Sequence, residues 1–352
     1  MQASENRALS PSAARVNLPA NRASEPLLGR VVRELSLLDA FVLAYHTILV
    51  LAALFGQGPA RATCLGQTVT LWVLFASALV LVRGGVLRHP TLAPLVHRVA
   101  MYGTFQASYF FLRDLLPLAS PHSLDTQLHG LDVALFGVEP TLWADQFITP
   151  ATTEWFSFFY YSYFFLLAVH VLPFLIVGKN RGLFPEFVMA IVGVYGISQL
   201  GYFLVPGYGP YHALAGQFPH ATLPRGFFQD LVQGAVSLGG AQKDIFPSLH
   251  TGGPFTIALF SFLHRDRAPF KYTWPVMMFF SLQIIGATLF LRWHWAVDVL
   301  AGLALSTTVT LLAGRVSRWE QGRRAARGLM PVWLDVGVPA HTGANREAST
   351  PA

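Results

Sequence analysis

The sequence predicts an all-α protein that crosses a membrane several times. Of its 352 residues, 53% are hydrophobic and only 12% are charged, whereas about 25% are charged in an ordinary soluble domain. Long apolar runs recur along the chain, and a helix needs roughly 20 apolar residues to cross the hydrocarbon core of a bilayer. Low charge and repeated apolar runs together predict a multi-pass membrane helical bundle.

The apolar runs divide the chain into a membrane domain at residues 36–314 and two tails. About eight transmembrane helices are expected, at residues 37–55, 68–83, 99–117, 155–177, 186–205, 246–263, 273–291 and 295–313. Residues 1–35 are polar and lack the apolar core of a signal peptide, so we expect a disordered N-terminal tail. Residues 315–352 are expected to form a loosely attached basic tail.

The basic residues are distributed unequally between the two sides of the predicted topology. Nineteen of the 24 Lys and Arg residues fall in segments on the side of the termini, and three fall in the opposite loops. Because basic segments stay in the cytoplasm, both termini are expected there, in a plasma or inner membrane. The basic charge therefore follows from topology, and nucleic-acid binding is not expected. Cys64 is alone, which excludes an intrachain disulfide and a thiolate metal cluster.

Polar residues gather at the extracytoplasmic starts of two predicted helices. The segment "DIFPSLHTGGPF" (244–255) places His250 about one turn into a helix whose first turn would hold Pro247. In "LRWHWAVDVLAG" (291–302), His294 and Asp298 are four residues apart and so share a helix face. Two helix N-termini would point free N–H groups at one region, which favours a phosphate.

Each of these residues also has a structural alternative. His250 and His294 alone are typical of interfacial histidines, and Arg292 alone would extend toward the headgroups. Asp298 is harder to explain, because an unpaired carboxylate inside a membrane-spanning helix costs on the order of 2.5–3.5 kcal/mol. We expect His294 to donate a hydrogen bond to it, which would orient the other ring nitrogen. The spacings are not those typical of zinc sites, so no metal is expected.

The motif "FPSLH", followed some 40 residues later by "R-x-H-x-x-x-D", resembles the type 2 phosphatidic acid phosphatase superfamily, which shares a helical core with vanadium haloperoxidases. "PSLH" in place of "PSGH", the arginine two residues before the second histidine, and "LDVALFGVEPTLW" (131–143) are similar to the branch of inositolphosphorylceramide and sphingomyelin synthases. The resemblance covers roughly residues 100–313 and implies a six-helix phosphatase-like core.

The resemblance implies a role for each motif residue. His294 would attack phosphorus and become phosphohistidine, with Asp298 orienting it. His250 would protonate the leaving alkoxide, and Ser248 would donate a hydrogen bond to phosphate. Histidines titrate in the range that both steps need, and the reaction otherwise requires in-line positioning and positive charge around the phosphate oxygens. No metal or other cofactor is implied.

Two departures from the phosphatase pattern concern phosphate binding. Thr288 stands where the pattern has an arginine, so Arg292 is expected to take over that task. The upstream "K-x6-R-P" motif is absent, and its place falls in the loop 206–245. Further candidates for phosphate contacts are Arg113, Lys243 and Arg225. The structural alternatives are an ion pair of Arg113 with Asp114 and a surface ion pair of Lys243 with Asp244. The glycines and prolines at 206–210 could form an anion nest, but a tight turn is the favoured interpretation. Tyr160, Tyr161 and Tyr163 are expected to serve packing.

These observations predict a lipid phosphate hydrolase or phosphotransferase that acts at the extracytoplasmic face on a phospholipid or other lipid phosphate. The synthase-like motifs favour transfer of a phospho-headgroup to a lipid acceptor such as ceramide or diacylglycerol. A simple lipid phosphate or pyrophosphate phosphatase is one alternative. A transporter is another, because intramembrane charges also mark transport pathways, but the sequence lacks the internal symmetry that such folds show.

Overall fold

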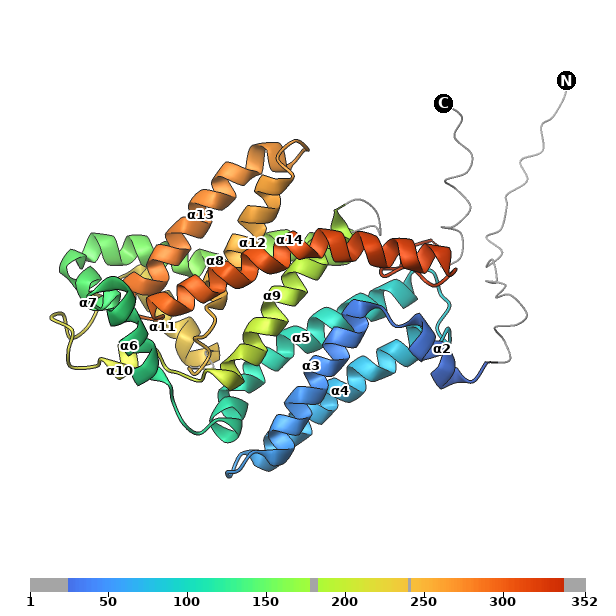
Figure 1. The fold of residues 1–352 in the computed structure, drawn as a ribbon, viewed down its shortest axis with the longest axis horizontal. Coiled ribbons are helices and arrows are strands. Elements are labelled where there is room, and N and C mark those ends of the chain that lie inside the picture. The colour runs from blue at the N-terminus through green and yellow to red at the C-terminus, as the bar shows by residue number, and fades with distance from the viewer. Residues whose placement is uncertain (1–24, 178–182, 240–241, 339–352) are drawn as a thin grey trace, which may run out of the picture.

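The computed structural model describes residues 25–177, 183–239 and 242–338 (Figure 1). The helices within these ranges are α2 (Leu27–Glu34), α3 (Leu37–Phe55), α4 (Arg61–Val82), α5 (Leu92–Ala119), α6 (Asp125–Phe136), α7 (Pro140–Ala144), the 3₁₀ turn η1 (Asp145–Phe147), α8 (Pro150–Val177), α9 (Phe184–Leu204), α10 (Pro210–Ala213), α11 (Phe227–Gly239), α12 (Leu249–Leu263), α13 (Phe270–Phe290) and α14 (Ala296–Ala326). The described chain forms no sheet, only one isolated bridge between Gly207 and Asp244. The all-α prediction is confirmed.

Every predicted membrane span corresponds to one long or apolar helix. Among the described residues, five helices are long and apolar enough to cross a membrane, namely α3, α4, α9, α13 and α14. α5 and α8 have 28 residues each, and α12 is apolar but has only 15 residues. α14 continues to Ala326, well past the predicted end at 313. The chain is an integral, multi-pass membrane protein.

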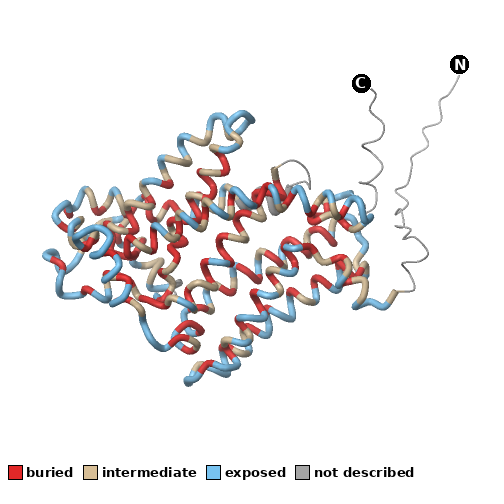
Figure 2. Tube along the Cα trace, in the orientation of Figure 1, coloured by how far each residue is buried: buried red, intermediate tan, exposed pale blue. Residues whose placement is uncertain are grey.

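The short helices mark one end of the bundle. α6, α7, α10 and α11 gather where α8 and α14 begin, at the end away from α2 (Figure 1); we call it the distal end. α2 and the segment 330–334 lie at the opposite, proximal end. Buried residues follow the helix sides that face one another, and exposed residues follow the outer sides (Figure 2). The outer sides carry large apolar residues such as Phe55 and Leu204, as expected where helices face lipid.

The proximal end differs from the expected loose tails. α2 packs beside α4, and the buried carboxylate of Glu34 accepts a hydrogen bond from the Met330 backbone N–H at 2.7 Å. Trp333 is 1% exposed. Residues 25–35 and 315–338 are therefore part of the packed structure, held by side-chain contacts to backbone groups that apolar periodicity does not reveal. Residues 1–24 and 339–352 lie outside the described residues.

Candidate active site

Two backbone contacts bring the starts of α12 and α14 together. The Ser248 N–H donates to the carbonyl oxygen of Asp298 at 3.0 Å. A Cβ at Gly302 would lie 2.5 Å from the carbonyl oxygen of Ser248, so only glycine permits this approach of the two helices. Because α12 begins at Leu249, three residues later than expected, His250 lies in its first turn.

The two motif histidines face each other across this junction. His294 lies in the short turn between α13 and α14, where Arg292 adopts φ +66°. The ring centroids of His250 and His294 are 5.9 Å apart. His294 Nδ1 lies 3.6 Å from Asp298 Oδ2, beyond hydrogen-bond range. Neither that Nδ1 nor Asp298 Oδ1 has a hydrogen-bond partner although both are buried, so a small ring movement would close the pair, as catalytic hydrogen bonds often do on substrate binding.

The N-terminus of α14 is already occupied by carboxylates. Asp298 Oδ2 accepts from the Trp295 N–H at 2.9 Å. Asp132, on α6, accepts from the N–H groups of Ala296 and Val297 at 2.7 and 2.8 Å. These N–H groups have no acceptor within the helix and lie at the positive end of its dipole. At α14 the expected phosphate contact is therefore wrong, because carboxylates of the protein accept from these N–H groups.

The loop at 206–210 is held in the same way. Asp125 accepts from the N–H groups of Tyr208 and Gly209 at 2.8 and 2.9 Å, and from the Trp295 indole at 2.9 Å. Gly209 has φ +89°, and a Cβ there would lie 2.4 Å from the Trp293 carbonyl oxygen. The loop is thus a tight turn whose free N–H groups bind a protein carboxylate. Asp125 and Asp132 are seven residues apart, so one face of α6 anchors both this loop and α14.

His250 and His294 line a cleft of about 420 Å³ at the distal end. Its other walls come from α5, α8, α10, α11, the loops 206–209 and 242–245, and the turn before α14. The lining side chains are Tyr109, Tyr160, Tyr208, Tyr211, Val236, Gln242, Asp244, Ile245 and Trp293. The Tyr160 ring stacks on His250 with centroids 4.5 Å apart. Tyr160 was expected to serve packing alone, and Tyr109, Tyr208, Tyr211 and Asp244 were missed.

Two predicted phosphate ligands, Ser248 and Lys243, are engaged away from this cleft. Ser248 is fully buried and caps α12, its hydroxyl accepting from the Thr251 N–H at 3.3 Å. Lys243 is also buried and donates to the carbonyl oxygens that follow α5, at 2.7 Å for Ser120 and 2.9 Å for His122. It therefore neutralises the C-terminal end of α5 and forms no ion pair with Asp244 among the described contacts.

The arginine candidates also have other partners. Arg113 donates to the Ser237 carbonyl oxygen at 3.0 Å, and exposed Arg225 pairs with Asp230 at 3.0 Å. Arg292 is 5% exposed and donates to the carboxylate of Asp145. Arg292 and Arg225 line a separate open basin of about 1220 Å³ next to the cleft.

Among the described residues, therefore, the lining of the cleft contains no lysine or arginine. Arg292, the expected replacement for the missing arginine, does not reach the paired histidines. The cleft instead offers tyrosine hydroxyls and the Gln242 amide as neutral hydrogen-bond donors.

Burial shifts the pKa values of two titratable groups in the cleft, His294 and Asp244. It lowers the pKa of His294 to about 4, against the opposing effects of the Asp244 carboxylate and the Ile245 backbone. Burial raises the pKa of Asp244, although the Tyr109 hydroxyl donates to it at 2.8 Å. At neutral pH the His294 imidazole is uncharged, which is the form that can act as a nucleophile. In the described chain, no three His, Cys, Asp or Glu side chains converge as metal ligands.

The fold and the cleft define a multi-pass membrane protein with two facing histidines at one end of its bundle. A protein-family model described as the PAP2 superfamily matches residues 126–312, more than half of the chain. The chain belongs to the PAP2 superfamily and is a phosphatase-type lipid phosphate enzyme. The match runs from α6 into α14 and includes His250, His294 and Asp298. No curated protein and no solved structure matches the chain.

Proposed function

We propose that the chain cleaves a lipid phosphate ester through a phosphohistidine at His294, and that it does so at the extracytoplasmic face. The observation that carries the proposal is the placement of two imidazoles 5.9 Å apart in one cleft, with Asp298 behind His294. A phosphoryl group between the rings would have a nucleophile on one side and a proton donor on the other.

The reaction follows from this arrangement. The His294 ring nitrogen that faces away from Asp298 attacks phosphorus, and Asp298 stabilises the imidazolium that forms. The bond from phosphorus to the ester oxygen breaks, and His250 gives its proton to the leaving alkoxide. A water or an alcohol then attacks the phosphohistidine, and His250 takes the proton of that hydroxyl.

Tyrosine hydroxyls supply the contacts to the phosphate oxygens. Tyr160, Tyr208 and Tyr211 line the cleft, and each can donate one O–H. Tyr109 already donates to Asp244. Neutral donors in a buried cleft stabilise developing negative charge more strongly than they would in water.

The basic residues support the orientation. Arg83, Arg88 and Arg98 belong to the proximal side, as do the described basic residues near the end of α14. Since basic segments stay in the cytoplasm, the distal end with its cleft would face the extracytoplasmic side of a plasma or inner membrane.

Transfer to a lipid hydroxyl is the form of the reaction that we favour. The open basin shares Tyr211, Gln242 and Trp293 with the cleft, so an acceptor or a polar headgroup in the basin would lie beside the phosphoryl group. The synthase-like motifs agree with a lipid acceptor such as ceramide or diacylglycerol. A transporter gains no support, because these titratable groups gather at one end of the bundle.

Product analysis tests this function. Purified protein in vesicles would receive a phospholipid labelled in its headgroup phosphate, together with ceramide or diacylglycerol. We expect a new labelled lipid that requires the acceptor, separated by thin-layer chromatography. Free phosphate as the only labelled product would contradict transfer and leave hydrolysis, whereas no turnover of any lipid phosphate would contradict both.

The acid side of the pH profile should report the low pKa of His294. Because the pKa is lowered to about 4, the nucleophile stays neutral down to that pH. Its protonation should therefore lower kcat/KM only below that pH. Asp244→Asn removes a charge that raises this pKa and should shift the midpoint further down. A midpoint at the ordinary histidine value of 6.5 in the wild type would contradict this prediction.

A further inference from the structure

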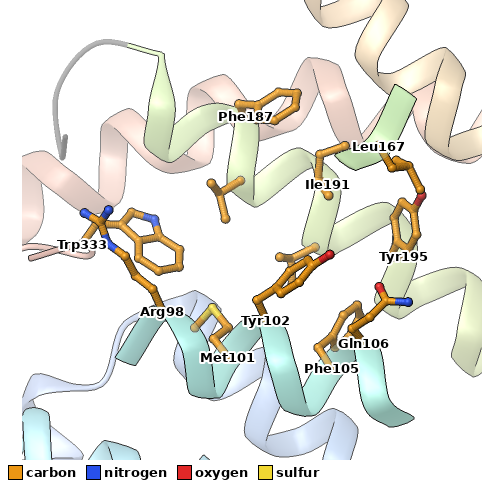
Figure 3. A pocket seen from close by; sticks show the side chains of 12 residues that line it. Arg98, Met101, Tyr102, Phe105, Gln106, Leu167, Phe187, Ile191, Tyr195 and Trp333 are labelled. Atoms are coloured by element: carbon orange, nitrogen blue, oxygen red, sulfur yellow. The ribbon is translucent and has the colours of Figure 1, made fainter. Parts of the chain in front are cut away.

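A second cavity lies between α5 and α9. It spans about 700 Å³, part of which is open to the surroundings, and it is almost entirely apolar, with walls that include Met101, Phe105, Leu167, Phe187 and Ile191. α5 packs closely against α4 but only loosely against α8 and α9, which leaves this space open. Figure 3 shows the side chains of α5 and α9 facing each other across it.

The cavity and the cleft share one face of α5. The cavity is lined at positions 98, 101, 102, 105 and 106, the spacing of a single helix face. Tyr109 continues this series by one turn and lines the cleft. The two spaces are therefore stacked along the same helix.

A pair of tyrosines separates the two spaces. The hydroxyls of Tyr163 and Tyr195 are 2.8 Å apart. The Tyr163 ring lies 4.5 Å from the His250 ring, between centroids, whereas Tyr195 lines the cavity. One side-chain layer thus stands between the cavity and a motif histidine.

Trp333 forms the proximal end of the cavity. Figure 3 shows Trp333 and Arg98 at one end, and Tyr195 and Gln106 at the other. Three arginines donate to the backbone of the segment around Trp333: Arg83 to the carbonyl oxygens of residues 331 and 332 at 2.8 and 2.7 Å, Arg98 to that of residue 334 at 2.7 Å, and Arg324 to that of residue 330 at 2.6 Å. All three are about 1% exposed. This end of the cavity is fixed.

We propose that the cavity binds a hydrocarbon chain of the lipid substrate and that Trp333 limits the chain length accepted. The proposal rests on the proposed function, because it places the phosphate of the same molecule between His250 and His294. The cleft is polar and has no room for a long chain, whereas the cavity is apolar, lies among membrane helices and continues along the face of α5 that reaches the cleft. A chain along that face would link the two, with the Tyr163–Tyr195 pair moving aside.

Chain-length kinetics test this assignment. Val192 lines the cavity, and Val192→Phe would fill part of it. We expect at least a tenfold loss of kcat/KM for long-chain phosphatidic acid and a change of less than twofold for dibutyryl phosphatidic acid. Ile197→Phe is the matched control, because Ile197 lies on α9 but is 41% exposed; it should change neither value. Trp333→Ala should shift the preferred chain length upward.

Equal loss for both chain lengths in Val192→Phe, or no loss for either, would overturn the assignment. Photolabelling supplies a readout that needs no turnover. Phosphatidic acid with a diazirine at the chain end should label residues 98–106, 187–195 and 330–334 of the wild-type protein, and less so Val192→Phe. Labelling confined to the outer helix faces would show an ordinary bilayer lipid and overturn the proposal. Cavity labelling without any ester cleavage would sustain the chain site and refute the proposed reaction.

Discussion

Replacing His294 by glutamine is expected to lower kcat/KM for lipid phosphate cleavage by at least about 1000-fold, since loss of a covalent nucleophile commonly costs more than that. Glutamine fills much of the same volume and keeps a hydrogen-bonding group near Asp298, but it cannot form a phosphoryl intermediate that breaks down. The neighbouring His250 cannot substitute, because its proton is needed by the leaving group. Release of product from a labelled phosphatidic acid measures the effect.

His122→Gln is the matched control for this variant. His122 is exposed at the same end of the bundle, and its backbone carbonyl, unaffected by the substitution, is the group that Lys243 contacts. Its kcat/KM should stay within about twofold of the wild type, because no reacting group is altered. If His294→Gln kept a tenth of the wild-type value or more while His122→Gln was unchanged, His294 would not be the nucleophile.

Asp132→Ala is expected to have the second largest effect, on both stability and activity. The substitution leaves the N–H groups of Ala296 and Val297 without their acceptor at the start of α14. Loss of an N-terminal cap and of buried hydrogen bonds to a charged group costs about 2–4 kcal/mol. Since His294 directly precedes this helix, its ring should also lose its position, with kcat/KM falling by about 100-fold.

Thermal unfolding in detergent and ester cleavage together measure both effects. Asp132→Asn keeps one acceptor oxygen and should fall between the wild type and Asp132→Ala. Asp266→Ala is the control, because the Asp266–Arg267 pair is solvent-exposed and such pairs contribute about 0–1 kcal/mol. Wild-type stability and activity in Asp132→Ala would show that the carboxylate does not organise the site.

The membrane helices were predictable because apolar runs are a local signal. The runs at 37–55 and 186–205 differ from α3 and α9 by at most two residues at either end. The end of α14 was not predictable in this way, because its last turns are fixed by contacts such as that of Arg324 with the Met330 carbonyl. Such pairing of a side chain with a distant backbone group leaves no periodic pattern.

The residues of the candidate site were predictable only where they belong to a short sequence motif. "PSLH" and "RWHWAVD" each place their histidine by local geometry, and the structure brings both into one cleft. The partners of the cations were not predictable. Sequence adjacency suggested Asp244 for Lys243, and the family resemblance suggested a phosphate for Arg292. The observed acceptors are carbonyl groups after α5 and the distant Asp145.

The carboxylates and tyrosines of the site come from separate segments. Asp132 fills an anion position that helix physics assigned to a phosphate, because the dipole of α14 attracts any carboxylate within reach. Tyr109, Tyr160 and Tyr211 belong to α5, α8 and α10. A single tyrosine among many aromatic residues does not by itself indicate a place in the site. Only their convergence in three dimensions distinguishes them.

The phosphorylated intermediate is the most direct test of the account. Protein mixed with lipid labelled in its phosphate, quenched within the first turnover and digested under alkaline conditions, should yield labelled phosphohistidine in the peptide containing residues 291–302. The label should be lost in acid, be absent from His294→Gln, and disappear when an acceptor is added. Steady turnover with no labelled protein at any time, or with the label on another residue, would contradict the account.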